Sequence, residues 1–169
     1  MDALVAVRAR IAAALVGQRQ FVDATLGAIT LRPHQVDAVH RLRLALRAHG
    51  GALLADAPGL GKTFVALAVA RDYGGAIIAA PAALRAQWML AAERAGVLIH
   101  WCSVEVLSRR PMTSQHALLV IDEAHHLRNP GTQRYAHTAT LAVGKRVLLL
   151  TATPVHNRPA ERDALLALF

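Results

Sequence analysis

The segment Leu53–Thr63 (LLADAPGLGKT) constrains the fold more than any other part of the sequence. In it a short apolar run leads into a glycine-containing turn, and Lys-Thr then opens a helical pattern. Gly59 and Gly61 allow backbone angles and a close approach that a Cβ atom would block, so successive amide N–H groups can converge on an anion at a helix N-terminus. The chain has seventeen arginines but only two lysines, and one of the two stands in this turn. The pattern therefore predicts a strand, a phosphate-binding loop and a helix in succession.

Size and composition indicate one folded domain. The chain has 169 residues, of which 54% are hydrophobic, so it can bury a substantial core. Its apolar stretches are interrupted by Arg, Asp, His or Pro well before the roughly 18 residues that a membrane span needs. The single cysteine, Cys102, excludes an internal disulfide and fits a reducing cytoplasm.

The charge balance favours a polyanionic partner. The net charge is +8 and the pI is about 11.2, as is common for proteins that bind nucleic acid. The arginines are scattered, however, and a solvated helix face explains their densest groups equally well. These groups are Arg41, Arg43 and Arg47 on a predicted helix, and Arg109 with Arg110.

The first thirty residues are expected to form a separate N-terminal helical segment, 1–30. Arg8 and Arg10 precede a short apolar run, but Gln18, Arg19 and Gln20 follow where a signal peptide would have a cleavage site of small residues. Apolar residues instead recur at helical spacing, which predicts a helix that packs on the main body or on a body outside this sequence. They are Leu4, Val7, Ile11, Leu15 and Val22.

The rest of the chain alternates between apolar runs and helical patterns. The runs lack the alternation of a half-exposed sheet, so we expect buried parallel strands with helices on both faces. The expected strands are Ala52–Ala55, Ala76–Ala80, Val97–Trp101, Ala117–Ile121 and Arg146–Leu150. The expected helices are His34–Ala48, Lys62–Asp72, Leu84–Ala95, Gln133–Ala142 and Pro159–Leu168.

An acidic pair, Asp122 and Glu123, directly follows one of the expected strands. Ligands of such sheets bind beyond the carboxyl ends of the strands, where the phosphate-binding loop is also expected. Asp122 is placed to hold Mg²⁺ through water, and Glu123 to polarise an attacking water as general base. An acidic pair after a strand can also be a helix cap or a solvated turn, but the Lys-Thr turn upstream favours the magnesium site.

Four segments in this order resemble the first RecA-like lobe of superfamily-two helicases. The chain is most similar to the Swi/Snf family, including its bacterial RapA-like members, and the similarity runs from Leu31 to Leu166. The strict phosphate-loop pattern has glycine where this chain has Asp56, but the family's loop commonly reads DEMGLGKT, which accounts for the aspartate. The segments are LRPHQ (31–35), DAPGLGKT (56–63), DEAHHLRN (122–129) and LLLTATPVHN (148–157).

The resemblance implies a fold, an activity and partners. It implies an α/β fold, a RecA-like P-loop three-layer sandwich with a mostly parallel sheet, over residues 31–169. It also implies an ATP hydrolase that uses ATP and Mg²⁺ to move along double-stranded DNA. Because the sequence ends soon after Thr151–Pro154, we expect a second RecA-like lobe to be supplied in cis or in trans. Without that lobe the chain should hydrolyse ATP slowly or not at all.

The resemblance also assigns roles to individual residues. Gln35 would contact the adenine, and the phosphates would be held by Asp56, Gly59, Leu60, Gly61, Lys62 and Thr63. Thr63 and Asp122 would serve Mg²⁺, and the catalytic set would be Lys62, Asp122, Glu123 and His125. Coupling to motion would involve His125, Thr151 and Thr153, with Ala152 in place of the family's glycine. Near the DNA-facing rim would lie Pro81, Gln87 and Trp88, within a segment that also matches at Ala80 and Leu84.

Other interpretations of these residues stay open. Trp88 and Trp101 can be core residues, and Gln35 can be an ordinary residue at a helix start. His125 and His126 suggest a metal, but their spacing fits no common zinc pattern. The chain can also be a lobe of another superfamily-two enzyme, of RNA-helicase or restriction type, or a non-catalytic adaptor that binds DNA or a protein. The match through Asn129 favours the Swi/Snf branch.

Overall fold

The structure is a computed structural model that describes residues 22–152 and 159–169. Within these residues, five strands form one sheet in which every neighbouring pair is parallel. In sheet order they are β3 (Gly51–Leu54), β7 (Arg146–Leu150), β6 (Leu118–Ile121), β4 (Ala76–Ala80) and β5 (Ile99–Ser103). Four of the strands, β3, β4, β6 and β7, are largely buried, which explains why their sequences are almost continuously apolar, whereas in the edge strand β5 only Cys102 is buried.

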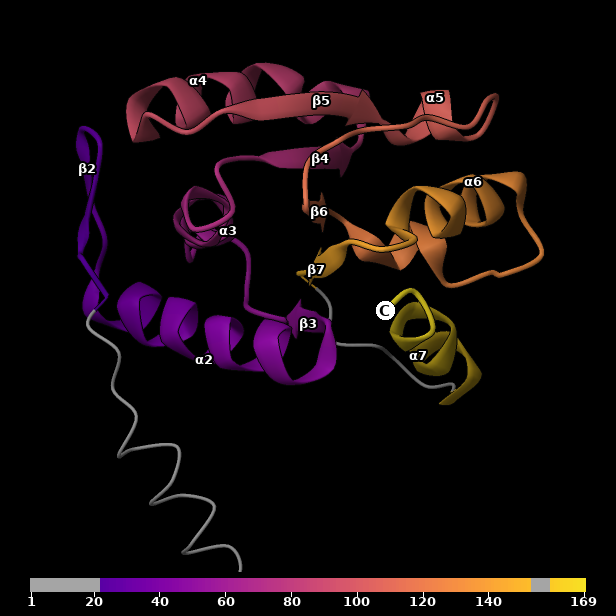
Figure 1. The fold of residues 1–169 in the computed structure, drawn as a ribbon, viewed down its shortest axis with the longest axis horizontal. Coiled ribbons are helices and arrows are strands. Elements are labelled where there is room, and N and C mark those ends of the chain that lie inside the picture. The colour runs from indigo at the N-terminus through magenta and orange to yellow at the C-terminus, as the bar shows by residue number, and fades with distance from the viewer. Residues whose placement is uncertain (1–21, 153–158) are drawn as a thin grey trace, which may run out of the picture.

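Helices cover both faces of this sheet, so the predicted three-layer α/β architecture is confirmed (Figure 1). One layer contains α2 (Pro33–His49), α3 (Lys62–Arg71) and α4 (Arg85–Ala95). The other contains α5 (Val104–Leu107), α6 (Gln133–Ala142) and α7 (Pro159–Leu166). No helix in the described part of the chain is both long and apolar enough to cross a membrane.

Two hydrophobic cores result from the alternation of side chains along the strands. Ile78, on β4, belongs to the core beneath α2, α3 and α4, whereas its neighbour Ile77 belongs to the core on the other side. Successive side chains of a strand point to opposite faces, so one apolar run supplies both cores. The same alternation relates Val120 to Leu119 on β6, and Leu148 to Leu149 on β7.

The five strands of the parallel sheet and the long helices lie within two residues of the predicted bounds. The largest shifts are of two residues: β5 begins at Ile99 rather than at Val97, and α7 ends at Leu166 rather than at Leu168. Gly96 ends α4 in the left-handed conformation, and the Val97 N–H donates to the Ala92 carbonyl, so Val97 belongs to the helix cap. Three short helices were not predicted, namely α5, η1 (Ala82–Leu84) and η2 (Ala124–Leu127).

The predicted N-terminal helical segment is wrong for its last residues. Residues 25–30 form a small antiparallel hairpin of β1 (Thr25–Leu26) and β2 (Ile29–Thr30). Gly27 makes the turn possible, because it has a φ of 58° and a Cβ there would lie 2.5 Å from the Arg94 carbonyl oxygen. The earlier part of the predicted segment, residues 1–21, lies outside the described residues.

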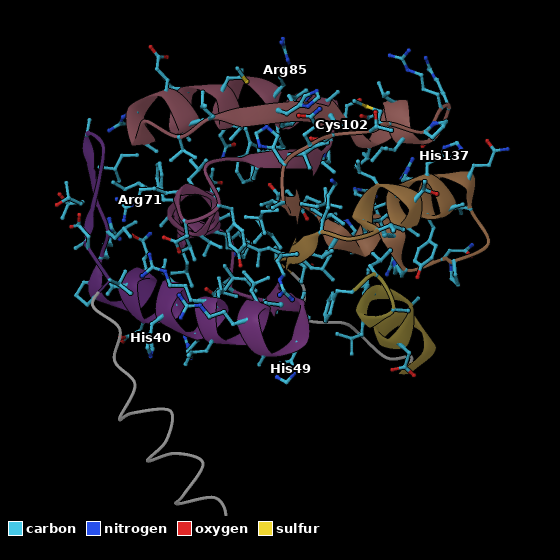
Figure 2. All side chains as sticks on the ribbon, in the orientation of Figure 1. His40, His49, Arg71, Arg85, Cys102 and His137 are labelled. Atoms are coloured by element: carbon cyan, nitrogen blue, oxygen red, sulfur yellow. The ribbon has the colours of Figure 1, made fainter. Side chains whose placement is uncertain are left out.

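The hairpin is fastened to the helical layer at two points. The Ala28 N–H donates to the Arg94 carbonyl of α4 at 2.8 Å. The Arg71 guanidinium, at the end of α3, donates to the Thr25 carbonyl at 2.7 Å, and Figure 2 shows this side chain between α3 and the hairpin. The hairpin therefore ties together the ends of two helices that pack on the same face of the sheet.

Candidate nucleotide-binding site

The loop between β3 and α3 owes its conformation to glycine. Gly59 and Gly61 have φ angles of 81° and 79°, in the left-handed region that L side chains rarely adopt. A Cβ at Gly61 would also overlap the Gln35 side-chain nitrogen. Because Gly61 directly precedes Lys62, the first residue of α3, the loop brings the backbone around the N-terminus of that helix. This geometry is what an anion at a helix N-terminus requires.

Lys62 lies across its own loop. Its ammonium group donates to the carbonyl oxygens of Asp56 and Ala57 at 2.8 and 3.2 Å. Asp56 therefore contacts Lys62 through its backbone carbonyl oxygen. Its role in phosphate binding stays a prediction. Since these acceptors are neutral, a phosphate group would offer the ammonium group a stronger partner than it has here.

Gln35 braces the loop from α2. Its side-chain oxygen accepts the Arg32 N–H at 2.9 Å, at the start of α2, and its side-chain nitrogen donates to the Leu60 carbonyl at 3.0 Å. The side chain is buried, with 6% of its surface exposed. The sequence did not predict this bracing contact, although Gln at the third position of a helix commonly reaches back to the N-terminal amide. Its contact with adenine stays a prediction.

Asp122 follows β6 and is held by two donors. The Trp88 indole N–H donates to Oδ2 at 3.0 Å, and the Glu123 backbone N–H donates to Oδ1 at 2.9 Å. Burial raises the pKa of the Asp122 carboxyl group, while both hydrogen bonds and the positive charge of Lys62 act in the opposite direction. Trp88 itself is fully buried, as expected of a core residue, but its contact with Asp122 was not predicted from the sequence.

Glu123 adopts an unusual backbone conformation. Among the described residues it is the one non-glycine residue with positive φ, at 51°. A positive φ is strained for a residue with a Cβ atom, so it persists only where the surrounding structure holds it. Residues of this kind occur often at functional sites. Glu123 immediately precedes η2, and its Oε2 lies 3.1 Å from the His125 Nδ1. These two atoms are in contact without the alignment of a hydrogen bond.

The two histidines of η2 lie side by side. Their ring centroids are 4.3 Å apart, and burial and the neighbouring His125 lower the pKa of His126. In residues 22–152 and 159–169, no three His, Cys, Asp or Glu side chains are arranged to hold a metal ion by themselves. A magnesium ion at Asp122 would therefore depend on Thr63, water and phosphate oxygens for its other ligands.

One cavity of about 490 Å³ connects the two sequence motifs. Lys62 and Asp122 lie sixty positions apart in the sequence, yet both line this cavity. The structure therefore brings together the predicted phosphate-binding loop and the acidic pair, at the edge where β3 and β6 end. A face of α4 forms the remaining wall. The lining residues are Pro58, Gly59, Gly61, Lys62, Thr63, Phe64, Leu84, Gln87, Leu90, Ala91, Arg94, Asp122, Glu123 and Ala152.

The residues expected to couple the site to motion are described in part. Thr151 follows β7 and is buried, and its N–H donates to the Leu54 carbonyl at 3.1 Å beside the start of the phosphate loop. Thr153 lies outside the described residues. Pro81 directly precedes η1, and Gln87 lies on the exposed side of α4 within the cavity lining. Their predicted proximity to DNA stays a prediction.

One arginine of the group on α2 has a structural explanation. Arg43 forms two hydrogen bonds to the Asp72 carboxylate, at 2.6 and 2.8 Å, which joins α2 to the end of α3. Arg41 and Arg47 are exposed on α2. Arg43 therefore contributes to packing between two helices rather than to an open basic surface.

The fold and the site define a RecA-like P-loop lobe. Residues 97–169 match the family model of the SNF2-related domain. A solved structure, the SWI2/SNF2 ATPase core of Sulfolobus solfataricus in complex with double-stranded DNA, superposes with a TM-score of 0.77 at 21% identity. The match covers 89% of this chain and 38% of that one, and confirms the fold.

Two curated relatives extend the similarity over most of the chain. The SWI/SNF-related matrix-associated actin-dependent regulator of chromatin subfamily A-like protein 1 of Xenopus tropicalis is 32% identical over 166 residues, which is 83% of this chain. The ATP-dependent helicase YqhH of Bacillus subtilis is 32% identical over 162 residues, which is 80% of this chain. The matched region spans 17% and 28% of these relatives' lengths. These comparisons confirm the predicted resemblance: the lobe is of the Swi/Snf type.

Proposed function

We propose that the chain is the ATP-binding lobe of a Swi/Snf-type DNA-dependent ATPase, which couples ATP hydrolysis to translocation on double-stranded DNA. The observation that supports this most is the single cavity lined by both the Gly59–Thr63 loop and the Asp122–Glu123 pair. Phosphoryl transfer needs a cradle for the phosphates, a site for the metal and a group that orients water, and these two segments supply residue types suited to all three. The cytoplasm is the expected compartment, because it keeps the thiol of Cys102 reduced.

Each part of the site has its own role in ATP binding and hydrolysis. The glycine loop turns backbone N–H groups toward the phosphates, and Lys62 exchanges its bonds to the Asp56 and Ala57 carbonyls for the β and γ phosphates. Glu123 accepts the proton of the attacking water, or orients that water, from the side opposite the leaving group. Gln35 holds the loop in place and is the expected contact for adenine.

The donor set at the cavity suits magnesium. A hard cation that retains several waters needs one or two protein oxygens, and the Thr63 hydroxyl and the Asp122 carboxylate both line the cavity. When bound there, Mg²⁺ neutralises negative charge on the phosphates. Asp122 has one donor on each of its oxygens, which fixes the orientation in which it can meet the ion or its water shell.

Calorimetric titration with MgADP and with a non-hydrolysable MgATP analogue tests the nucleotide site. The wild-type chain should bind both, whereas Lys62→Ala should lose binding because the phosphates lose their cation. Lys145→Ala is the matched control, since Lys145 is the other lysine and donates to the Ser114 carbonyl away from the cavity. Tight nucleotide binding by a folded Lys62→Ala protein would contradict the proposed site.

Turnover on DNA is a separate test. In related phosphoryl transfer an arginine supplied by a second domain contributes roughly 10³ to 10⁵ in rate, so we expect rapid hydrolysis only after a second RecA-like lobe is added. In that reconstituted enzyme Glu123→Gln should trap ATP unhydrolysed. Duplex DNA should stimulate the wild-type enzyme more than single-stranded RNA does. Stronger stimulation by RNA would favour an RNA helicase, and normal function with Glu123→Gln would favour a non-catalytic adaptor.

A further inference from the structure

The contact between Trp88 and Asp122 joins two distant parts of the chain in a buried place. Trp88 lies on α4 and is 0% exposed, and its indole N–H is 3.0 Å from Asp122 Oδ2. Asp122 is 9% exposed and stands at the end of β6. A buried indole N–H needs an acceptor, and a buried carboxylate needs donors, so each group satisfies the other.

The two hydrogen bonds to Asp122 have different origins. The Glu123 N–H is local, because it belongs to the next residue, and it occupies Oδ1. The Trp88 N–H comes from another layer of the fold and occupies Oδ2. The local bond alone would leave the carboxylate free to swing about it, whereas the second bond fixes the plane of the group. The remaining lone pairs then face a defined direction.

Trp88 is not among the residues that line the cavity, although its neighbours Gln87 and Ala91 are. It therefore acts from behind the carboxylate and leaves the cavity side open. Residues that hydrogen-bond to a metal-binding group from behind orient that group and tune its affinity for the metal.

We propose that Trp88 is a positioning residue for the magnesium site, and that its indole N–H, and not only its packing, holds Asp122 in the orientation that meets the metal. This inference rests on the proposed function for the identity of the ligand, MgATP. The contact itself is a property of the protein alone, so it can be observed without nucleotide.

The first arm of the test observes the contact by NMR. The chain has two tryptophans, so Trp101→Phe leaves a single indole N–H signal, that of Trp88. We expect this signal to lie downfield and to exchange slowly with solvent, as for a buried N–H bonded to a carboxylate. Asp122→Ala should move it upfield, whereas Glu123→Gln, which retains the backbone N–H, should leave it nearly in place. If the chemical shift of the Trp88 indole N–H were the same in Asp122→Ala as in the parent protein, the proposal would be overturned.

The second arm measures the magnesium requirement of nucleotide binding. Trp88→Phe should raise the Mg²⁺ concentration for half-maximal binding of the ATP analogue by about ten- to a hundredfold, the usual effect of losing such a supporting bond. Nucleotide binding in EDTA should change by less than about twofold, because the phosphate loop is untouched. Trp101→Phe is the matched control, with the same substitution on β5, and should alter neither quantity.

Trp88→Phe removes both the packing of the indole ring and its N–H, so the two effects must be measured separately. In the Trp101→Phe background, Trp88 can be replaced by 3-benzothienylalanine, whose sulfur substitutes for the N–H with nearly unchanged shape. The proposal requires this analogue to show the same magnesium defect as Trp88→Phe. A wild-type magnesium requirement in the analogue would overturn the proposal and leave the proposed function intact. If the wild-type chain showed no Mg²⁺-dependent nucleotide binding, both would be overturned.

Discussion

At the residue scale, two glycines with similar backbone angles allow the effect of backbone strain on stability to be distinguished from an effect on nucleotide binding. Gly61 and Gly144 have φ angles of 79° and 71°, so alanine at either position should cost about 1 to 2 kcal/mol of unfolding free energy. A Cβ at Gly144 has open space around it, whereas a Cβ at Gly61 would displace Gln35 from its bond to Leu60.

We therefore expect Gly61→Ala, but not Gly144→Ala, to weaken nucleotide binding by about tenfold or more, since one such bond corresponds to roughly that factor. Urea denaturation measures the first effect and calorimetric titration the second. Equal nucleotide affinities in the two variants would show that the Gln35 brace is unimportant to the loop.

Cys102 should be chemically quiet in the folded protein. Figure 2 shows it on β5 near α5, and the thiol is 2% exposed, with its sulfur 3.0 Å from the Met112 sulfur. Burial raises the pKa of Cys102 from 9.0 to about 11, against a smaller opposing effect of Arg110. Below pH 9 the thiolate fraction is then about a hundredfold lower than in the unfolded chain.

Alkylation by iodoacetamide should accordingly be at least about a hundredfold slower in native than in guanidine-unfolded protein at pH 8, and should accelerate with pH up to about 11. Mass spectrometry follows the reaction. Equal rates in the two states would mean that the thiol is exposed and its pKa ordinary.

At the scale of elements, α7 (Pro159–Leu166) packs on the sheet with one side of the helix. Leu165 is 2% exposed and belongs to the core on the α6 side, whereas its neighbour Leu166 is 40% exposed. Leu165→Ala should lower the free energy of unfolding by about 2 to 5 kcal/mol, and Leu166→Ala by less than about 0.5 kcal/mol. Urea denaturation curves of both variants would measure the difference. Similar losses would mean that α7 does not dock in this orientation.

The sequence predicted the main elements because their signals are local. Apolar runs such as Ala76–Ala80 are too short for helices and too uniformly apolar for exposed strands, and the observed β4 has these bounds. The hairpin at residues 25–30 could not be predicted, because strands of two residues have no periodicity that distinguishes them from the end of the helical pattern upstream. The short helices η1 and α5 could not be predicted either, because three or four residues are too few to show helical periodicity.

At the scale of the whole molecule, the sequence predicted that the Gly59–Thr63 loop and the Asp122–Glu123 pair lie together. It did not predict the hydrogen bonds that support them. Parallel strands place their carboxyl ends at one edge, so Lys62 and Asp122 were expected together, and both line one cavity. The bonds from Gln35 to Leu60 and from Trp88 to Asp122 join residues 25 and 34 positions apart. Such contacts depend on how helices pack on the sheet, and no spacing rule in the sequence encodes them.

We propose above all that one metal–nucleotide complex lies between the Gly59–Thr63 loop and the Asp122–Glu123 pair. Mn²⁺ can replace Mg²⁺ with a non-hydrolysable ATP analogue, and its paramagnetism broadens the NMR signals of nearby nuclei. We predict that the backbone amides of both Thr63 and Asp122 are among the most strongly broadened, while Gly144, before the start of β7, is little affected. Strong broadening at only one of the two segments, or at neither, would contradict the account.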